Sequence, residues 1–151
     1  MIKFFDSKRA VALKKLGVLS SDELFNMAEV AVAQGCDNPL IIRLSMCESS
    51  EDEINYQLDE IEKQCGLTAM TVVDALRFYS KEVSGLILSG GLSPRDGANI
   101  LWRAQINSKI EDFHELDGFI YAASEMDDRP EDKKLFEDGI LREAGRVIGE
   151  Y

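Results

Sequence analysis

The chain has 151 residues, of which 45% are hydrophobic and 30% are charged, and its net charge at neutral pH is −11. This length and hydrophobic content are typical of one folded domain and exclude a disordered chain. The negative charge repels phosphate backbones and anionic lipid, so we expect no direct binding to nucleic acid or to a membrane. It favours a basic partner, although an acidic surface can also serve only to keep a protein in solution.

The cysteines and the first residues indicate where the protein acts. Three cysteines, Cys36, Cys47 and Cys65, form no CxxC pair, and their odd number is typical of reduced thiols in a reducing compartment. The start is not a signal peptide, because Lys14-Lys15 interrupts its apolar run. The longest uncharged run has twelve residues, 83–94, whereas a membrane span needs about 20. We therefore expect a cytoplasmic protein.

The first half of the chain predicts four helices. Residues 6–16 are expected to form a short helix that stops at Gly17, and residues 1–17 carry five basic side chains and one acidic one. Ser20-Ser-Asp-Glu23 and Ser50-Glu-Asp-Glu53 are capping boxes, in which the serine oxygen accepts from the amide three residues on and the glutamate reaches back. Pro39 opens another short helix between them.

Residues 67–104 are the least acidic long stretch and predict a helical hairpin. Gly90-Gly91 separates its two helices, and Ser93-Pro94 begins the second helix, which carries the only tryptophan, Trp102. We expect the other helices to pack on this hairpin. The first helix has apolar residues at alternating steps of four and three, which form one stripe: Val72, Leu76, Tyr79, Val83 and Leu86.

Two more helices are predicted after the hairpin, one with an apolar stripe from Phe113 to Ala123 and one that begins at Pro130. No stretch shows the sustained period-two alternation of a strand. The sequence therefore predicts an all-α protein, in which residues 1–151 form one compact, single-domain antiparallel bundle of seven or eight helices.

Acidic residues concentrate in two blocks that flank a nearly neutral centre. Residues 18–65 carry eleven acids and two bases, and residues 111–151 carry thirteen acids and five bases. If both blocks face the same way, they form one acidic surface. The densest clusters lie at helix starts and hold more acids than capping needs, so we predict that they bind a basic partner, although solvated helix starts are the alternative. The predicted binding residues are Glu48, Glu51, Asp52, Glu53, Asp127, Asp128, Glu131 and Asp132.

The residues that carry enzyme or metal chemistry are scarce. Glu111-Asp-Phe-His114 has the Glu-x-x-His spacing of di-iron bundles, but such sites need the motif twice and His114 is the only histidine. The single histidine also excludes a histidine-rich zinc site, and the acidic runs lack the EF-hand pattern. We predict no catalytic residue, no metal ligand and no cofactor. A carboxylate-dependent or metal-assisted hydrolase is the alternative, because two acids with raised pKa values need no fixed spacing.

Two segments resemble small bacterial immunity proteins that accompany contact-dependent or polymorphic toxins. They are residues 17–24 with the helix that follows, and residues 119–132 with Phe136 and Ile140. The resemblance implies a non-catalytic cytoplasmic inhibitor that covers the active surface of a basic toxin domain, often a nuclease. It carries over no site residue, because these families share a strategy more than a site. A scaffold or adaptor with no inhibitory role is a further alternative.

Overall fold

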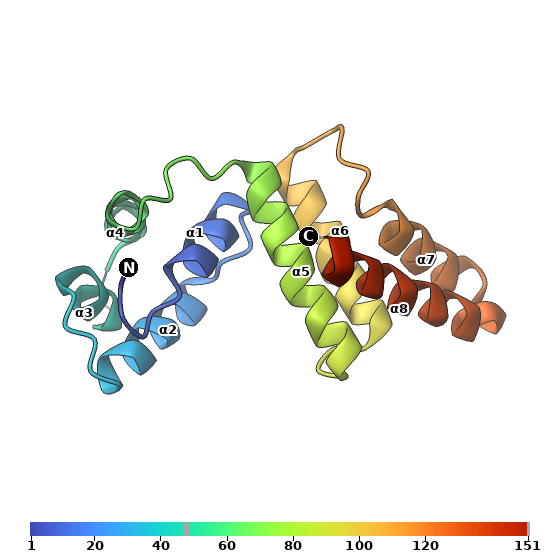
Figure 1. Ribbon diagram of the computed structural model, residues 1–151, viewed down its shortest axis with the longest axis horizontal. Helices are drawn as coiled ribbons and strands as arrows, with labels where there is room; N and C mark the ends of the chain where they lie inside the picture. Colours follow the sequence, from blue (N-terminus) through green and yellow to red (C-terminus); the bar gives the residue numbers. More distant parts are fainter. Residues whose placement is uncertain (47–48, 151) are drawn as a thin grey trace. The chain divides into compact units, whose positions relative to one another are not determined.

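The computed structural model describes residues 1–46 and 49–150, which are all-α and include eight α-helices, one short 3₁₀ helix and no strand (Figure 1). The predicted all-α fold class is confirmed. Contacts within the chain group it into two compact units, Met1–Thr71 and Val72–Tyr151. The prediction that residues 1–151 form a single domain stays a prediction.

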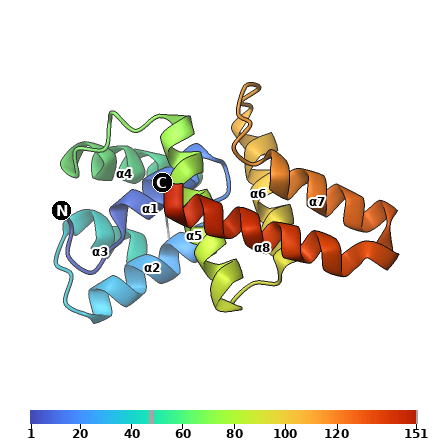
Figure 2. The ribbon, with the colours of Figure 1, turned by 45° about the vertical axis from the view of Figure 1, so that its right-hand side comes forward.

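The first unit contains α1 (Ser7–Lys15), α2 (Ser21–Ala33), α3 (Pro39–Ser45) and α4 (Glu51–Gln64) (Figure 2). Helix α2 packs on α3, and α4 packs on both α1 and α3. These helices bury a core of their own. The prediction that they pack on the central hairpin stays a prediction. The core consists of Ile2, Phe5, Ala10, Val11, Leu24, Ala28, Ala31, Cys36, Ile41, Leu44, Ile54, Leu58 and Ile61.

The serine helix starts are formed as predicted. The Oγ atoms of Ser20 and Ser50 accept hydrogen bonds from the amides of Glu23 and Glu53, at 3.1 and 3.3 Å. In the second unit, Ser93 Oγ accepts in the same way from the amide of Asp96, at 3.1 Å. Each serine satisfies one of the amides that the first helical turn leaves without a backbone partner.

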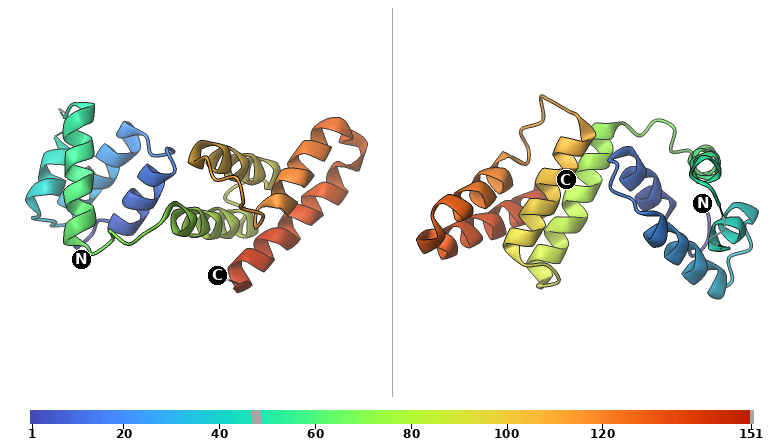
Figure 3. Two further views of the ribbon diagram at one scale, coloured as in Figure 1. Left: turned by 90° about the horizontal axis from the view of Figure 1, so that it is seen from above. Right: turned by 180° about the vertical axis from the view of Figure 1, so that it is seen from behind.

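The second unit contains α5 (Val72–Ser89), α6 (Pro94–Ser108), α7 (Asp117–Asp128), the 3₁₀ helix η1 (Pro130–Asp132) and α8 (Lys133–Glu150). Figure 3 shows two antiparallel pairs, α5 with α6 and α7 with α8. Helix α8 also packs on α5, and α7 packs on α6. The predicted hairpin therefore exists, and it organises the second unit.

The buried face of α5 differs from the predicted stripe. Leu76 and Val83 are buried as expected, but Leu86 is 43% exposed and its neighbour Ile87 is buried in its place. The predicted stripe contained only apolar residues, but small polar side chains also face the core. Small side chains can be buried there because they leave room for neighbouring helices to approach. Three small residues of α5 are fully buried: Ala75, Ser80 and Ser84.

Gly97 of α6 lies close to the side chain of Ile87 on α5. A Cβ atom at this position would lie 2.4 Å from both Cγ1 and Cδ1 of Ile87, whose side chain is itself buried. Only a residue without a side chain fits there, because a contact this short would push Ile87 out of its place in the core.

None of the helices in residues 1–46 and 49–150 is both long enough and apolar enough to cross a membrane.

The close approach at Gly97 is tested by comparing Gly97→Ala with Gly145→Ala. Gly145 is exposed on α8, and a Cβ atom there would meet nothing within 4 Å. Alanine favours a helix over glycine by about 1 kcal/mol, so Gly145→Ala should raise the free energy of unfolding by up to about that amount. Gly97→Ala should lower it by about 1–3 kcal/mol because of overpacking. Urea denaturation measures both, and a Gly97→Ala variant as stable as wild type would contradict the described α5–α6 contact.

Candidate functional site

The predicted acidic residues lie at two places, one in each unit. The first acidic cluster, Glu51, Asp52 and Glu53, forms the first turn of α4. The second acidic cluster, Asp127, Asp128, Glu131 and Asp132, spans the end of α7 and the 3₁₀ helix η1. The prediction that the clusters lie at helix starts is therefore wrong for Asp127 and Asp128, which are the last residues of α7. Glu48 lies outside the described residues. The prediction that both clusters form one acidic surface stays a prediction.

In the first cluster, Glu53 is partly neutralised and the other two acids are not. One carboxylate oxygen of Glu53 lies 3.6 Å from Nη2 of Arg43, on α3. Glu51 and Asp52 are exposed, and neither forms an ion pair with a described residue. The start of a helix carries a partial positive charge, which stabilises all three carboxylates where they stand.

Arg129 stabilises the turn between α7 and η1, where the second cluster lies. Its Nε donates to Oε2 of Glu125 at 2.9 Å, and its Nη1 lies 3.9 Å from Oδ2 of Asp132. Its guanidinium carbon lies 5.0 Å from the ring centroid of Phe136, a cation–π distance. The Phe136 ring in turn meets the ring of Tyr121 edge to face. One arginine thus fixes both ends of the turn against an aromatic pair.

The remaining acids of the second cluster divide in the same way as those of the first. Asp127 pairs with Arg95, on α6. Asp128 and Glu131 are exposed and form no ion pair with any residue that the structure describes. Of the seven predicted acids that are described, four therefore remain without a base: Glu51, Asp52, Asp128 and Glu131.

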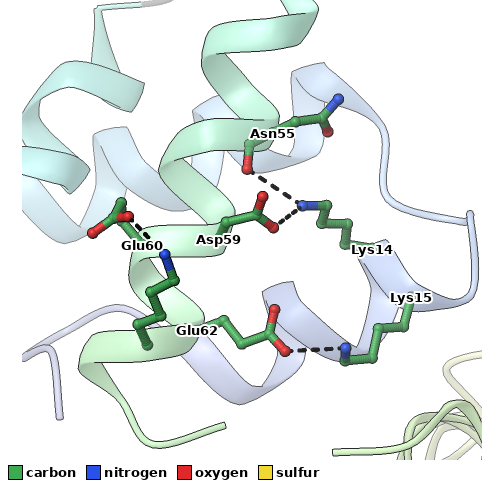
Figure 4. A network of polar contacts seen from close by, with 7 residues as sticks. Lys14, Lys15, Asn55, Asp59, Glu60 and Glu62 are labelled. Carbon is green, nitrogen blue, oxygen red and sulfur yellow. Dashed lines mark hydrogen bonds and ion pairs between the residues drawn. The ribbon is translucent and has the colours of Figure 1, made fainter. Parts of the chain in front are cut away.

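Two lysines of α1, Lys14 and Lys15, bind acids of α4 within the first unit, as Figure 4 shows. Lys14 Nζ donates to Oδ1 of Asp59 at 2.8 Å and to the backbone oxygen of Asn55 at 3.3 Å. Lys15 Nζ lies 3.1 Å from a carboxylate oxygen of Glu62. These contacts join α1 to α4, and Lys63 Nζ donates to Glu60 within α4 at 3.3 Å. The acids of α4 without a described base are therefore Glu51 and Asp52, in its first turn.

Arg9 completes the pattern. Its Nη1 lies 2.6 Å from Oε1 of Glu23, which joins α1 to α2. Glu23 and Glu53 are the third helical residues of the two capping boxes, and each pairs with an arginine of a neighbouring helix. Sequence analysis missed these arginines. Arg129 differs, because it lies four residues after Glu125 and three before Asp132, and such short spacings could have been noticed in the sequence.

The hydrogen bond from Lys14 lowers the pKa of Asp59 below its usual 3.8, and the charges of Lys14, Lys63 and Lys15 lower the pKa further, against a smaller opposing effect of burial. A carboxyl group whose pKa is lower in the folded chain than in the unfolded chain stabilises the fold above its unfolded pKa. That stabilisation is lost as the pH falls through the pKa of the folded state.

Asp59→Asn tests this link between α1 and α4. Because the Asp59 side chain is 58% exposed, the variant should lower the free energy of unfolding at pH 7 by only about 0.2–1 kcal/mol. The difference from wild type should shrink as the pH falls below 3.8. Urea denaturation at several pH values measures it, and Asp37→Asn, at an exposed loop residue, is the matched control. A difference that persists unchanged at pH 2 would contradict the role of the ion pair.

His114 has a local partner. It is exposed, and its Nδ1 lies 3.0 Å from Oδ2 of Asp117, three residues on. In the described part of the chain, no group of three or more His, Cys, Asp or Glu side chains is arranged so that it could hold a metal ion. The predicted absence of a metal ligand stays a prediction.

No model of a known protein family, no curated protein and no solved structure matches the chain. The likeness of residues 17–24 and 119–132 to immunity proteins therefore stays a resemblance, and the candidate site depends on the geometry of this chain alone.

Proposed function

We propose that this protein is a non-catalytic acidic binding protein that neutralises a basic partner, in the manner of an immunity protein that covers the active surface of a toxin nuclease in the cytoplasm. The observation that carries the proposal is the set of four exposed acids without a base, Glu51, Asp52, Asp128 and Glu131. An acid that already pairs within the chain has less to gain from a partner's lysine or arginine. These four carboxylates are available without breaking any described ion pair.

The placement of the four acids also supports the proposal. Glu51 and Asp52 stand on a capped helix turn, and Asp128 and Glu131 flank the turn that Arg129 holds. Groups that are already held in place lose little conformational freedom when a partner binds, so more of the interaction energy contributes to affinity.

Charge would act mainly on the rate of encounter. A net charge of −11 attracts a basic protein over a distance that shortens as the salt concentration rises. The same charge repels the phosphate backbone of nucleic acid, with which an inhibitor would compete for the surface of a nuclease. Exposed ion pairs add little affinity, so contacts that exclude water would be needed to hold the complex together.

We expect a gene next to the one for this chain to encode a basic protein, and that protein tests the proposal. We expect the two purified proteins to form a complex with one copy of each, and we expect co-expression to restore the growth of cells that the basic protein alone inhibits. A neighbouring gene product that neither binds this protein nor loses its toxicity would contradict the proposal.

Charge reversals test which acids receive the partner. Two double variants, Glu51→Lys with Asp52→Lys and Asp128→Lys with Glu131→Lys, should each slow association on the order of tenfold at about 0.1 M salt. The loss should shrink at 1 M salt, where the Debye length is only about 3 Å. Stopped-flow or surface plasmon resonance kinetics measure the association rates. Stability should change little, because exposed charges at helix ends contribute about 0.3–1 kcal/mol each.

A third double variant controls for net charge. Glu29→Lys with Asp37→Lys changes the charge by the same amount at exposed acids outside both clusters. It should slow association less than either cluster variant does. Equal losses in all three variants would mean that the acidic clusters act only through the total charge and form no binding site.

A further inference from the structure

A groove in the second unit leaves apolar side chains open to solvent. It has a volume of about 260 Å³ and lies beside the end of α6. Ile106 is 64% exposed, and Trp102, Ile110 and Ile120 are partly exposed. An aromatic ring and branched aliphatic side chains on one open surface are typical of the centre of a protein interface. The Trp102 groove is lined by Trp102, Gln105, Ile106, Lys109, Ile110, Glu111 and Ile120.

The wall of this groove is held in place by the chain itself. Gln105 Nε2 donates to the backbone oxygen of Phe113 at 3.0 Å, which ties the end of α6 to the segment before α7. Lys109 ends α6 with a φ of +58°, in the left-handed region that favours glycine. Lys109 therefore has a strained backbone at the edge of the groove, and a glycine at this position would have less strain.

The two charges at the groove are opposite in sign and close in sequence. Lys109 and Glu111 are both exposed, and neither forms an ion pair within the described residues. A two-fold axis brings the same patch of two subunits together. If one residue of the first copy contacts a second residue of the other copy, the same contact therefore occurs with the two copies exchanged. Lys109 of each copy can then meet Glu111 of the other, which makes the edge of the groove complementary to itself.

The location of the groove also suits contact between two copies. Each copy carries a charge of −11, so two copies repel each other through most of their surface. Residues 66–110 are the exception, with three acids and five bases, and they include most of the groove. The charge of the acidic clusters favours a basic partner, whereas the nearly neutral segment that carries the groove favours contact with a second copy.

We propose that the Trp102 groove is the contact surface of a two-fold homodimer, in which Trp102 and Ile106 of both copies pack together and Lys109 pairs with Glu111 across the axis. This inference does not depend on the proposed partner, because it uses none of the four unpaired acids.

Sedimentation equilibrium and Trp102 fluorescence test the proposal on the same full-length protein. Since Trp102 is the only tryptophan, its emission reports on this groove alone. We expect the mass to rise toward that of a dimer between about 1 μM and 1 mM protein at about 0.15 M salt, a range that brackets weak association. The emission should move to shorter wavelength over the same range. A monomer at all concentrations would overturn the proposal.

Variants locate the contact. Ile106→Glu, at an exposed position that should not affect folding, should weaken dimerisation at least tenfold, because it places a charge at the centre of the interface. Leu88→Glu on α5 is the matched control, since Leu88 is also exposed and does not line the groove. A dimer that Leu88→Glu weakens as much as Ile106→Glu does would contradict the proposed surface.

A charge swap tests the pairing. Lys109→Glu should weaken the dimer by placing like charges together, and Lys109→Glu with Glu111→Lys should restore it, because the swap rebuilds both pairs in reverse. Lys109→Gly should fold at least as well as wild type and still dimerise more weakly. Failure of the swap to restore the dimer would overturn the proposed pairing, and so would a Lys109→Gly variant that dimerises like wild type.

Discussion

Acids outnumber bases in this protein, 28 to 17, so ion pairing cannot neutralise every carboxylate. Which acids remain free depends on where the bases lie. The lysines of α1 and Arg9 bind Asp59, Glu62 and Glu23, and these contacts join helices of the first unit. Of the predicted acids, those left without a described base are Glu51 and Asp52 at the first turn of α4, and Asp128 and Glu131 around the turn between α7 and α8. Pairing within the chain thus decides which acids of each cluster are open to a partner.

Both acidic clusters combine pairing with exposure. In each cluster, some acids are turned toward an arginine and others toward solvent, as Glu53 and Arg43 show in the first and Asp127 and Arg95 in the second. These pairs are themselves about half exposed, so the unpaired carboxylates take their position from the helical backbone that carries them. A partner that approaches either cluster would therefore meet charges on structured helix ends.

The neutral part of the chain has a different surface character. The Trp102 groove has an aromatic ring and branched aliphatic side chains with one charge of each sign, whereas the open groups of the acidic clusters are carboxylates. The two proposed contact surfaces therefore differ in chemistry. This is why a basic partner is proposed for one and a second copy for the other.

The sequence by itself determined the all-α fold, the helix starts at Ser20, Ser50 and Ser93, and the position of both acidic clusters along the chain. Capping and helical periodicity act over a few residues, so they can be read without knowing the fold. Only the tertiary structure decided that the first unit buries its own core, that Ile87 rather than Leu86 faces inward, and that Trp102 is partly exposed. It also decided which acids are free, because Asp127 meets Arg95 from 32 residues away and Asp59 meets Lys14 from 45. Such pairs depend on how the helices pack against one another, and this packing cannot be predicted from a few neighbouring residues of the sequence.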